Sequence, residues 1–68
     1  MKTLNLDKRI KLLADRFVEN KEHTPKWDYE ESKKDYRQML QQFCEALEVN
    51  TDKYLRYFDR QWKRYKVR

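Results

Sequence analysis

Residues 51–66 read TDKYLRYFDRQWKRYK, and this stretch carries apolar and basic side chains at two offset helical spacings. The apolar series recurs every three or four residues and comprises Leu55, Phe58, Trp62 and Tyr65. The basic series follows a similar spacing and comprises Lys53, Arg56, Arg60, Lys63 and Arg64. Because an α-helix repeats every 3.6 residues, the two series lie on nearly opposite faces. The stretch therefore predicts a helix that buries its aromatic face and exposes its basic face.

Two further amphipathic helices are predicted upstream, at residues 5–20 and 28–48. Asn5 is the predicted N-cap of the first helix. For the second helix, Asp28 with Glu31 as its capping-box partner is favoured as N-cap over Thr24 with Pro25 at the first helical position. The apolar stripe of the first helix comprises Leu6, Ile10, Leu13, Ala14 and Phe17. The apolar face of the second comprises Tyr29, Tyr36, Met39, Leu40, Phe43, Ala46 and Leu47. Both patterns have the helical period, so each helix is expected to bury one side.

The three predicted helices are joined by short connections with few turn-forming residues. The chain has no glycine and a single proline, Pro25, so strand-rich folds with many tight turns are not expected. Val49 and Asn50 form a very short turn before the last helix, with Asn50 as its N-cap. We predict an all-α fold, a compact three-helix bundle forming one domain over residues 1–68. The alternative is a helical dimer in which two chains share one core.

The 68-residue chain has a net charge of +5, and the excess is concentrated at its C-terminal end. Residues 50–68 carry seven Lys and Arg side chains against two Asp. The single cysteine, Cys44, has no second cysteine to pair with, which is typical of a cytoplasmic protein. The sequence holds no apolar run of about 18 residues, so a membrane span is not expected.

The basic face of the last helix is the predicted functional surface. A row of Lys and Arg displaces counterions from a phosphate backbone and so binds nucleic acid without reading its sequence. The tyrosine nearest to this face, Tyr57, is the aromatic most available to a partner. The candidate binding residues are Lys53, Arg56, Tyr57, Arg60, Lys63 and Arg64. The predicted function is that of a small basic nucleic-acid-binding protein, with DNA favoured over RNA.

Residues 43–55 resemble a helix-turn-helix, in which a second helix reads the DNA major groove. The residues that carry the resemblance are Ala46, Val49, Asn50 and Leu55. The segment departs from the motif at Glu48, where the turn usually carries glycine. The resemblance implies a regulator of the kind made by bacteria, plasmids or phages. It also implies that the groove-facing side chains are Thr51, Lys53, Arg56, Tyr57 and Arg60. The alternative is an ordinary αα-hairpin.

A second functional class is a protein-interaction module, such as a small inhibitor, antirepressor or immunity protein. In that case the basic helix docks on an acidic partner, and Trp27, in the connection before the second predicted helix, is the natural anchor. Cys44 and His23 lie in different predicted elements, so an enzyme is not expected. No cofactor motif is present, and no metal site is expected because the chain has one histidine and one cysteine.

Overall fold

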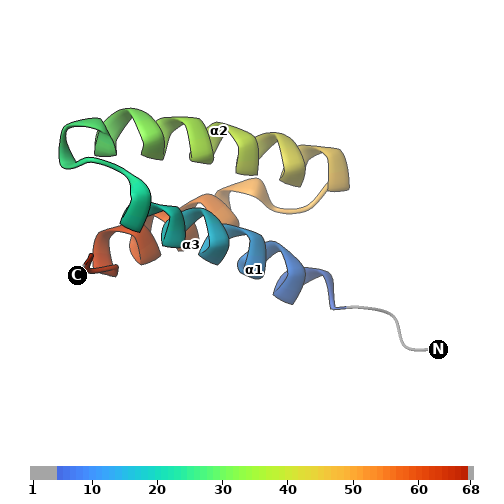
Figure 1. Ribbon diagram of the computed structural model, residues 1–68. Helices are drawn as coiled ribbons and strands as arrows, with labels where there is room; N and C mark the ends of the chain where they lie inside the picture. The colour runs from blue at the N-terminus through green and yellow to red at the C-terminus, as the bar shows by residue number, and fades with distance from the viewer. Residues whose placement is uncertain (1–4, 68) are drawn as a thin grey trace.

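The computed structural model describes residues 5–67, and within this range the chain forms three α-helices and no strand (Figure 1). The α-helices are α1 (Leu6–Glu19), α2 (Tyr29–Leu47) and α3 (Thr51–Arg64). Two short 3₁₀ turns, η1 (Asn20–His23) and η2 (Lys26–Asp28), connect α1 to α2. The predicted three-helix bundle is confirmed. Of the domain predicted over residues 1–68, residues 1–4 and 68 lie outside the described part.

Two of the three predicted helix starts carry the expected side-chain caps. The Asn5 and Asn50 side chains each accept a hydrogen bond, from the Lys8 and Lys53 backbone N–H groups at 3.3 Å. Asp28 precedes α2 as predicted, but its carboxylate accepts instead from the Ser32 hydroxyl at 3.2 Å. The predicted capping box with Glu31 is therefore wrong. The reason is that Asp28 belongs to the η2 turn, and its backbone is not extended as that of a capping residue is.

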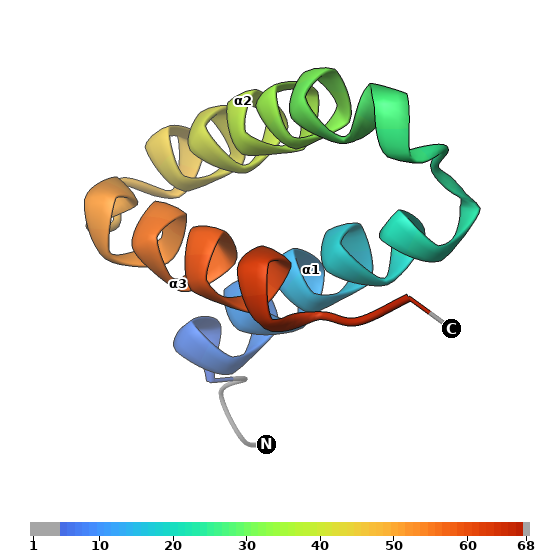
Figure 2. The same cartoon turned by 90° about the vertical axis from the view of Figure 1, so that its left-hand side faces the viewer.

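The helix α3 packs against both other helices, whereas α1 and α2 contact each other over a smaller surface. In Figures 1 and 2, α1 and α3 lie against each other and α2 lies across from them. The buried core draws on all three helices and comprises Ile10, Ala14, Val18, Leu40, Cys44, Tyr54, Leu55, Phe58 and Trp62. Burying large aromatic rings in this way gives a small chain much of its apolar burial.

The apolar face predicted for α2 is only partly buried. Leu40 and Cys44 are completely buried, whereas Met39 is 47% exposed and Phe43 is 40% exposed. Phe43 was predicted to lie on the buried face of this helix, but Cys44, which was not included in that face, is the more deeply buried of the two. The cause is the small contact surface between α1 and α2, which leaves the side of α2 that bears Met39 and Phe43 open to solvent.

The turn between α2 and α3 depends on a left-handed residue. Glu48 has φ 58° and ψ 41°, a conformation that costs most residues about 1–2 kcal/mol relative to the right-handed region. The Val49 backbone N–H donates to the Cys44 carbonyl oxygen at 3.2 Å, and the Glu48 N–H donates to the Glu45 carbonyl oxygen at 3.1 Å. These two bonds form a Schellman motif. It reverses the chain so that α3 returns alongside α2, the arrangement of an αα-hairpin (Figure 2).

Candidate nucleic-acid interface

The five basic residues predicted on the outer face of α3 are all exposed, but they differ in their partners. The Lys53 ammonium lies 3.1 Å from the Asp7 carboxylate of α1, and the Arg56 guanidinium lies 3.1 Å from Asp52 on its own helix. Within residues 5–67, Arg60, Lys63 and Arg64 form no salt bridge. The uncompensated positive charge of α3 therefore lies in its C-terminal half.

Three of the predicted residues meet side chains of α2 in a groove between α2 and α3. This surface, called here the basic groove, has a volume of about 650 Å³. Its lining residues are Lys21, Tyr29, Glu30, Lys33, Arg56, Asp59, Arg60, Trp62 and Lys63. Five of these residues are cationic and two are carboxylates. The Asp59 carboxylate already has ion-pair partners, because the Arg37 guanidinium lies 2.8 Å from it and the Lys33 ammonium lies 4.0 Å from it. The groove thus presents a local excess of positive charge.

The buried side of this groove contains a lysine, Lys21, that lies between the first two predicted helices. Lys21, in η1, is only 9% exposed, and its ammonium donates to the Trp62 carbonyl oxygen at 2.8 Å and to the Tyr65 carbonyl oxygen at 3.3 Å. The same ammonium lies 5.1 Å from the Tyr29 ring centre and 5.2 Å from that of Trp62. Burial, followed by the nearby charge of Lys33, lowers the pKa of Lys21. Lys21 therefore caps the C-terminal end of α3.

Tyr57 and Arg64 lie on the other side of α3, toward α1. Both line a second groove together with Asp15 and Glu19. The half-buried Tyr57 donates its hydroxyl to Asp15 at 2.9 Å, and burial followed by this bond raises the pKa of the tyrosine. The structure thus separates these two residues from the basic groove. Sequence spacing indicated that Tyr57 is the aromatic most available to a partner, but its hydroxyl is hydrogen-bonded to Asp15 of α1.

The N-terminal end of α3 is held against α1 by a charged cluster around Asp7. The Tyr54 hydroxyl donates to the Asp7 carboxylate at 2.7 Å, and Lys53 and Lys11 lie 3.1 and 3.4 Å from it. The bond from Tyr54, and next that from Lys53, lowers the pKa of Asp7 to about 2. The same Tyr54–Asp7 bond, with burial, raises the pKa of Tyr54 to about 12. Lys53 thus has a structural partner in this cluster.

The Tyr54–Asp7 bond makes stability depend on pH at both ends of the scale. Because the folded pKa of Asp7 is about 2, the contribution of this carboxylate to the free energy of unfolding is complete above pH 3.8 and is lost as the pH falls toward 2. Because the folded pKa of Tyr54 is about 12, its contribution is complete below 10.0 and is lost as the pH rises toward 12. We expect Tyr54→Phe to reduce the loss of unfolding free energy at both low and high pH. Urea unfolding at a series of pH values measures this dependence. A Tyr54→Phe profile parallel to that of the wild type would contradict this assignment.

Cys44, the single cysteine of the chain, lies in the core. Cys44 is buried, and burial raises the pKa of its thiol, so the reactive thiolate is disfavoured. No cluster of three or more His, Cys, Asp and Glu side chains within residues 5–67 could hold a metal ion. None of the helices in this range combines the length and the apolar content needed to cross a membrane.

Comparison of the chain with protein-family models, with curated proteins and with solved structures finds no significant match.

Proposed function

We propose that the protein binds the phosphate backbone of duplex DNA through the basic groove. The observation that carries the proposal is the position of Arg60 and Lys63, which form no salt bridge within residues 5–67 and lie beside Lys33 and Arg56 in one groove. Cationic side chains without carboxylate partners are available to displace the counterions of a phosphate backbone. This term provides most of the affinity of non-specific binding.

The spacing of these side chains suits a nucleic-acid strand. Arg56 and Lys63, with Arg60 between them, are seven positions apart on α3, which corresponds to about 10.5 Å along the helix axis. Measured along the duplex axis, the phosphates of one DNA strand are about 3.4 Å apart, so a row of this length parallel to that axis passes about three of them. Duplex DNA is favoured over RNA because the row lies on an exposed helix face. The DNA major groove admits a helix, whereas the major groove of double-stranded RNA is too narrow for side chains to read.

The test removes three charges from the groove and compares the result with the removal of three charges elsewhere. We expect the combined replacement of Arg56, Arg60 and Lys63 by glutamine to weaken binding to a short mixed-sequence duplex at least about tenfold at low salt. It should also reduce the salt dependence by about one unit of slope per lost contact. Fluorescence anisotropy over a series of salt concentrations measures both quantities.

The matched control replaces Lys8, Lys26 and Lys34 by glutamine. These lysines are exposed, form no salt bridge within residues 5–67 and do not line the basic groove, so the net charge changes equally. The control is expected to keep most of the affinity. Equal losses of DNA affinity in the two triple variants would show that binding depends on net charge and not on the basic groove. Undetectable binding of the wild type at low salt would exclude the proposal.

An acidic protein surface is the alternative partner for the same groove. The specific observation that favours a protein partner is Trp27, which is 85% exposed in η2 and lies outside the lining of the basic groove. Exposed tryptophans are frequent anchors of protein interfaces. Trp27→Ala is expected to leave DNA affinity unchanged. Loss of a nuclease-resistant protein complex in Trp27→Ala would favour the alternative.

A further inference from the structure

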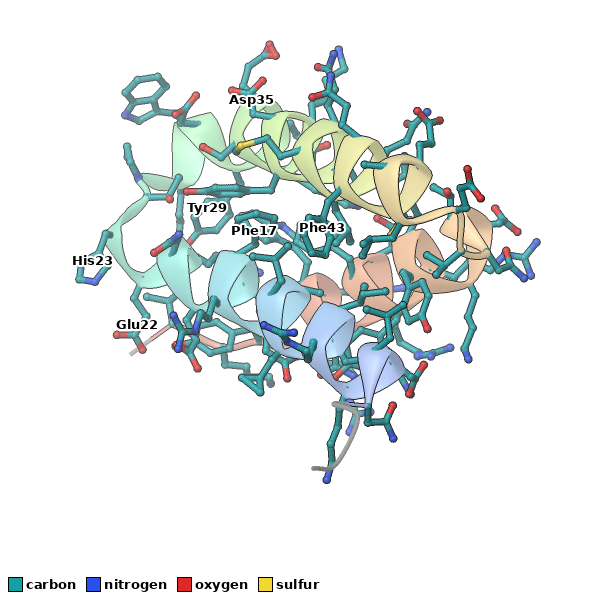
Figure 3. The ribbon with its side chains drawn as sticks, turned by 90° about the vertical axis from the view of Figure 1, so that its right-hand side faces the viewer. Phe17, Glu22, His23, Tyr29, Asp35 and Phe43 are labelled. Atoms are coloured by element: carbon teal, nitrogen blue, oxygen red, sulfur yellow. The ribbon has the colours of Figure 1, made fainter. Side chains whose placement is uncertain are left out.

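A third groove, on a different face, lies between α1 and α2. It is called here the apolar groove, and it has a volume of about 560 Å³. Its lining residues are Leu6, Arg9, Leu12, Leu13, Arg16, Phe43 and Leu47. Figure 3 shows Phe17 from α1 and Phe43 from α2 pointing into the space between these two helices, on the side away from α3. None of the residues proposed for DNA binding lines this groove.

The apolar groove leaves large hydrophobic side chains in contact with water. Leu12 is 52% exposed, and Leu6 and Phe43 are each 40% exposed. Three of the six large hydrophobic side chains exposed within residues 5–67 thus lie in this groove. Single exposed apolar residues are ordinary, but a contiguous group with a polar rim is typical of an interaction site.

The charge around this groove is positive. Arg9 and Arg16 both line the groove, and neither forms a salt bridge within residues 5–67. Among the described residues that line the groove, none carries a carboxylate. The two arginines are seven residues apart on α1, so they lie on the same side of that helix and about 10.5 Å apart along its axis. A ligand with matching negative charges would face both arginines at once.

We propose that the apolar groove binds an amphipathic helix of a partner protein that carries carboxylates along one edge of its apolar face. The α1 wall runs from Leu6 to Arg16, which is about 15 Å, so the bound segment has about three turns. Its apolar side chains recur at three- and four-residue spacing, and two carboxylates lie seven residues apart to meet Arg9 and Arg16. This is helix-in-groove recognition, in which the new helix covers the apolar side chains.

Two other occupants fit the groove less well. A nucleic-acid backbone gains little from a floor of leucine and phenylalanine, because phosphates need donors and positive charge along their whole path. A second copy of the chain in a two-fold dimer would place the same patch on both sides of the interface. Arg9 and Arg16 of one copy would then meet the same arginines of the other. A partner with negative charge avoids this repulsion.

The probe for this site is a synthetic helical peptide of about fourteen residues, with leucines along one face and two flanking glutamates seven residues apart. A second peptide has lysine in place of both glutamates. Titration of the isotope-labelled protein is expected to shift the backbone amide resonances of residues 6–16 and 43–47 with the glutamate peptide. The same peptide is expected to bind about tenfold more tightly than the lysine peptide, because two rim ion pairs are gained.

A charge exchange distinguishes this groove from general attraction to a basic protein. The Arg9→Glu/Arg16→Glu variant is expected to reverse the preference and bind the lysine peptide more tightly. The control variant Arg60→Glu/Lys63→Glu has the same net charge and is expected to keep the preference for the glutamate peptide. Leu12→Ser is a second groove variant with no change of charge, and a loss of binding of at least about fivefold is expected.

Three results would overturn the proposal. The first is equal affinity for the two peptides, and the second is resonance shifts confined to α3 residues. The third is a concentration-dependent dimer in sedimentation that Leu12→Ser abolishes, since this would identify a second copy as the occupant. Binding to DNA is measured with a separate probe, and the peptide test uses Arg60 and Lys63 only as control positions, so the two proposals stand or fail independently.

Discussion

Replacing Phe58 with alanine is expected to destabilise the protein severely. Phe58 is completely buried in the core, and its ring centre lies 5.8 Å from that of Trp62. A buried Phe→Ala replacement costs about 3–5 kcal/mol, from lost burial and from the cavity that remains. Natural domains gain about 0.05–0.15 kcal/mol per residue on folding, so a chain of this length has about 3–10 kcal/mol in total. The replacement removes much or all of that stability.

Urea unfolding followed by far-ultraviolet circular dichroism measures this effect. The matched control is Phe43→Ala, which removes the same ring from a position that is 40% exposed on α2. Because less area is taken from water at Phe43, the control should lose about 1 kcal/mol and keep a cooperative transition. A cooperative transition in Phe58→Ala, with a loss as small as that of the control, would show that the ring is not central to the core.

Replacing Lys21 with methionine is expected to lower the free energy of unfolding by about 2 kcal/mol. Methionine keeps the apolar stem but removes the ammonium that donates to the Trp62 and Tyr65 carbonyl oxygens. Hydrogen bonds from charged donors contribute about 1.5–3 kcal/mol, and the two aromatic contacts add to this. Relief of the burial penalty on the ammonium offsets part of the loss. The thermal midpoint should fall by about 8–16 °C.

The control for this variant is Lys26→Met, which makes the same change at an exposed lysine five residues away. Its effect should stay within about 0.5 kcal/mol, as for most surface substitutions. Calorimetry or thermal circular dichroism compares the two variants directly. A Lys21→Met protein as stable as the wild type would mean that the burial penalty of the ammonium cancels its hydrogen bonds and aromatic contacts.

The helices were predictable from sequence because their signals are local. Asn5 and Asn50 each precede an amphipathic segment, and the structure places both at the N-caps of their helices. The periodic stripe of α3 likewise identified Phe58 and Trp62 as buried. Each of these features depends on residues within a few positions of one another. A single sequence contains that information directly.

The errors concern how closely neighbouring helices approach. Phe43 and Cys44 are adjacent in sequence and lie on either side of the apolar face of α2, so the helical period alone does not decide which is buried more deeply. The distance between α1 and α2 decides it, and that distance results from the packing of both helices on α3. The αL conformation of Glu48 was equally hard to predict, since glycine is the residue usually found there.

The sequence predicted which basic residues are exposed at the candidate site, but not which of them form ion pairs with carboxylates. Periodicity indicated correctly that Arg56, Arg60 and Lys63 are exposed. It gave no sign that Lys53 pairs with Asp7, more than forty residues away, because that contact is created by tertiary packing. The sequence indicated the capping role of Lys21 only indirectly. The C-terminal end of α3 has no glycine cap, so its last carbonyl groups need donors from elsewhere in the chain.

The contrast between the two tryptophans has a spectroscopic consequence. Trp62 is 5% exposed and is surrounded by other aromatic rings, whereas Trp27 is 85% exposed. The fluorescence of the folded chain is therefore the sum of a core-like emission at shorter wavelength and a water-like emission at longer wavelength. Unfolding shifts the first component to the red and leaves the second almost unchanged. A ligand that covers η2 moves only the second, so the two components report separately on folding and on contacts at that turn.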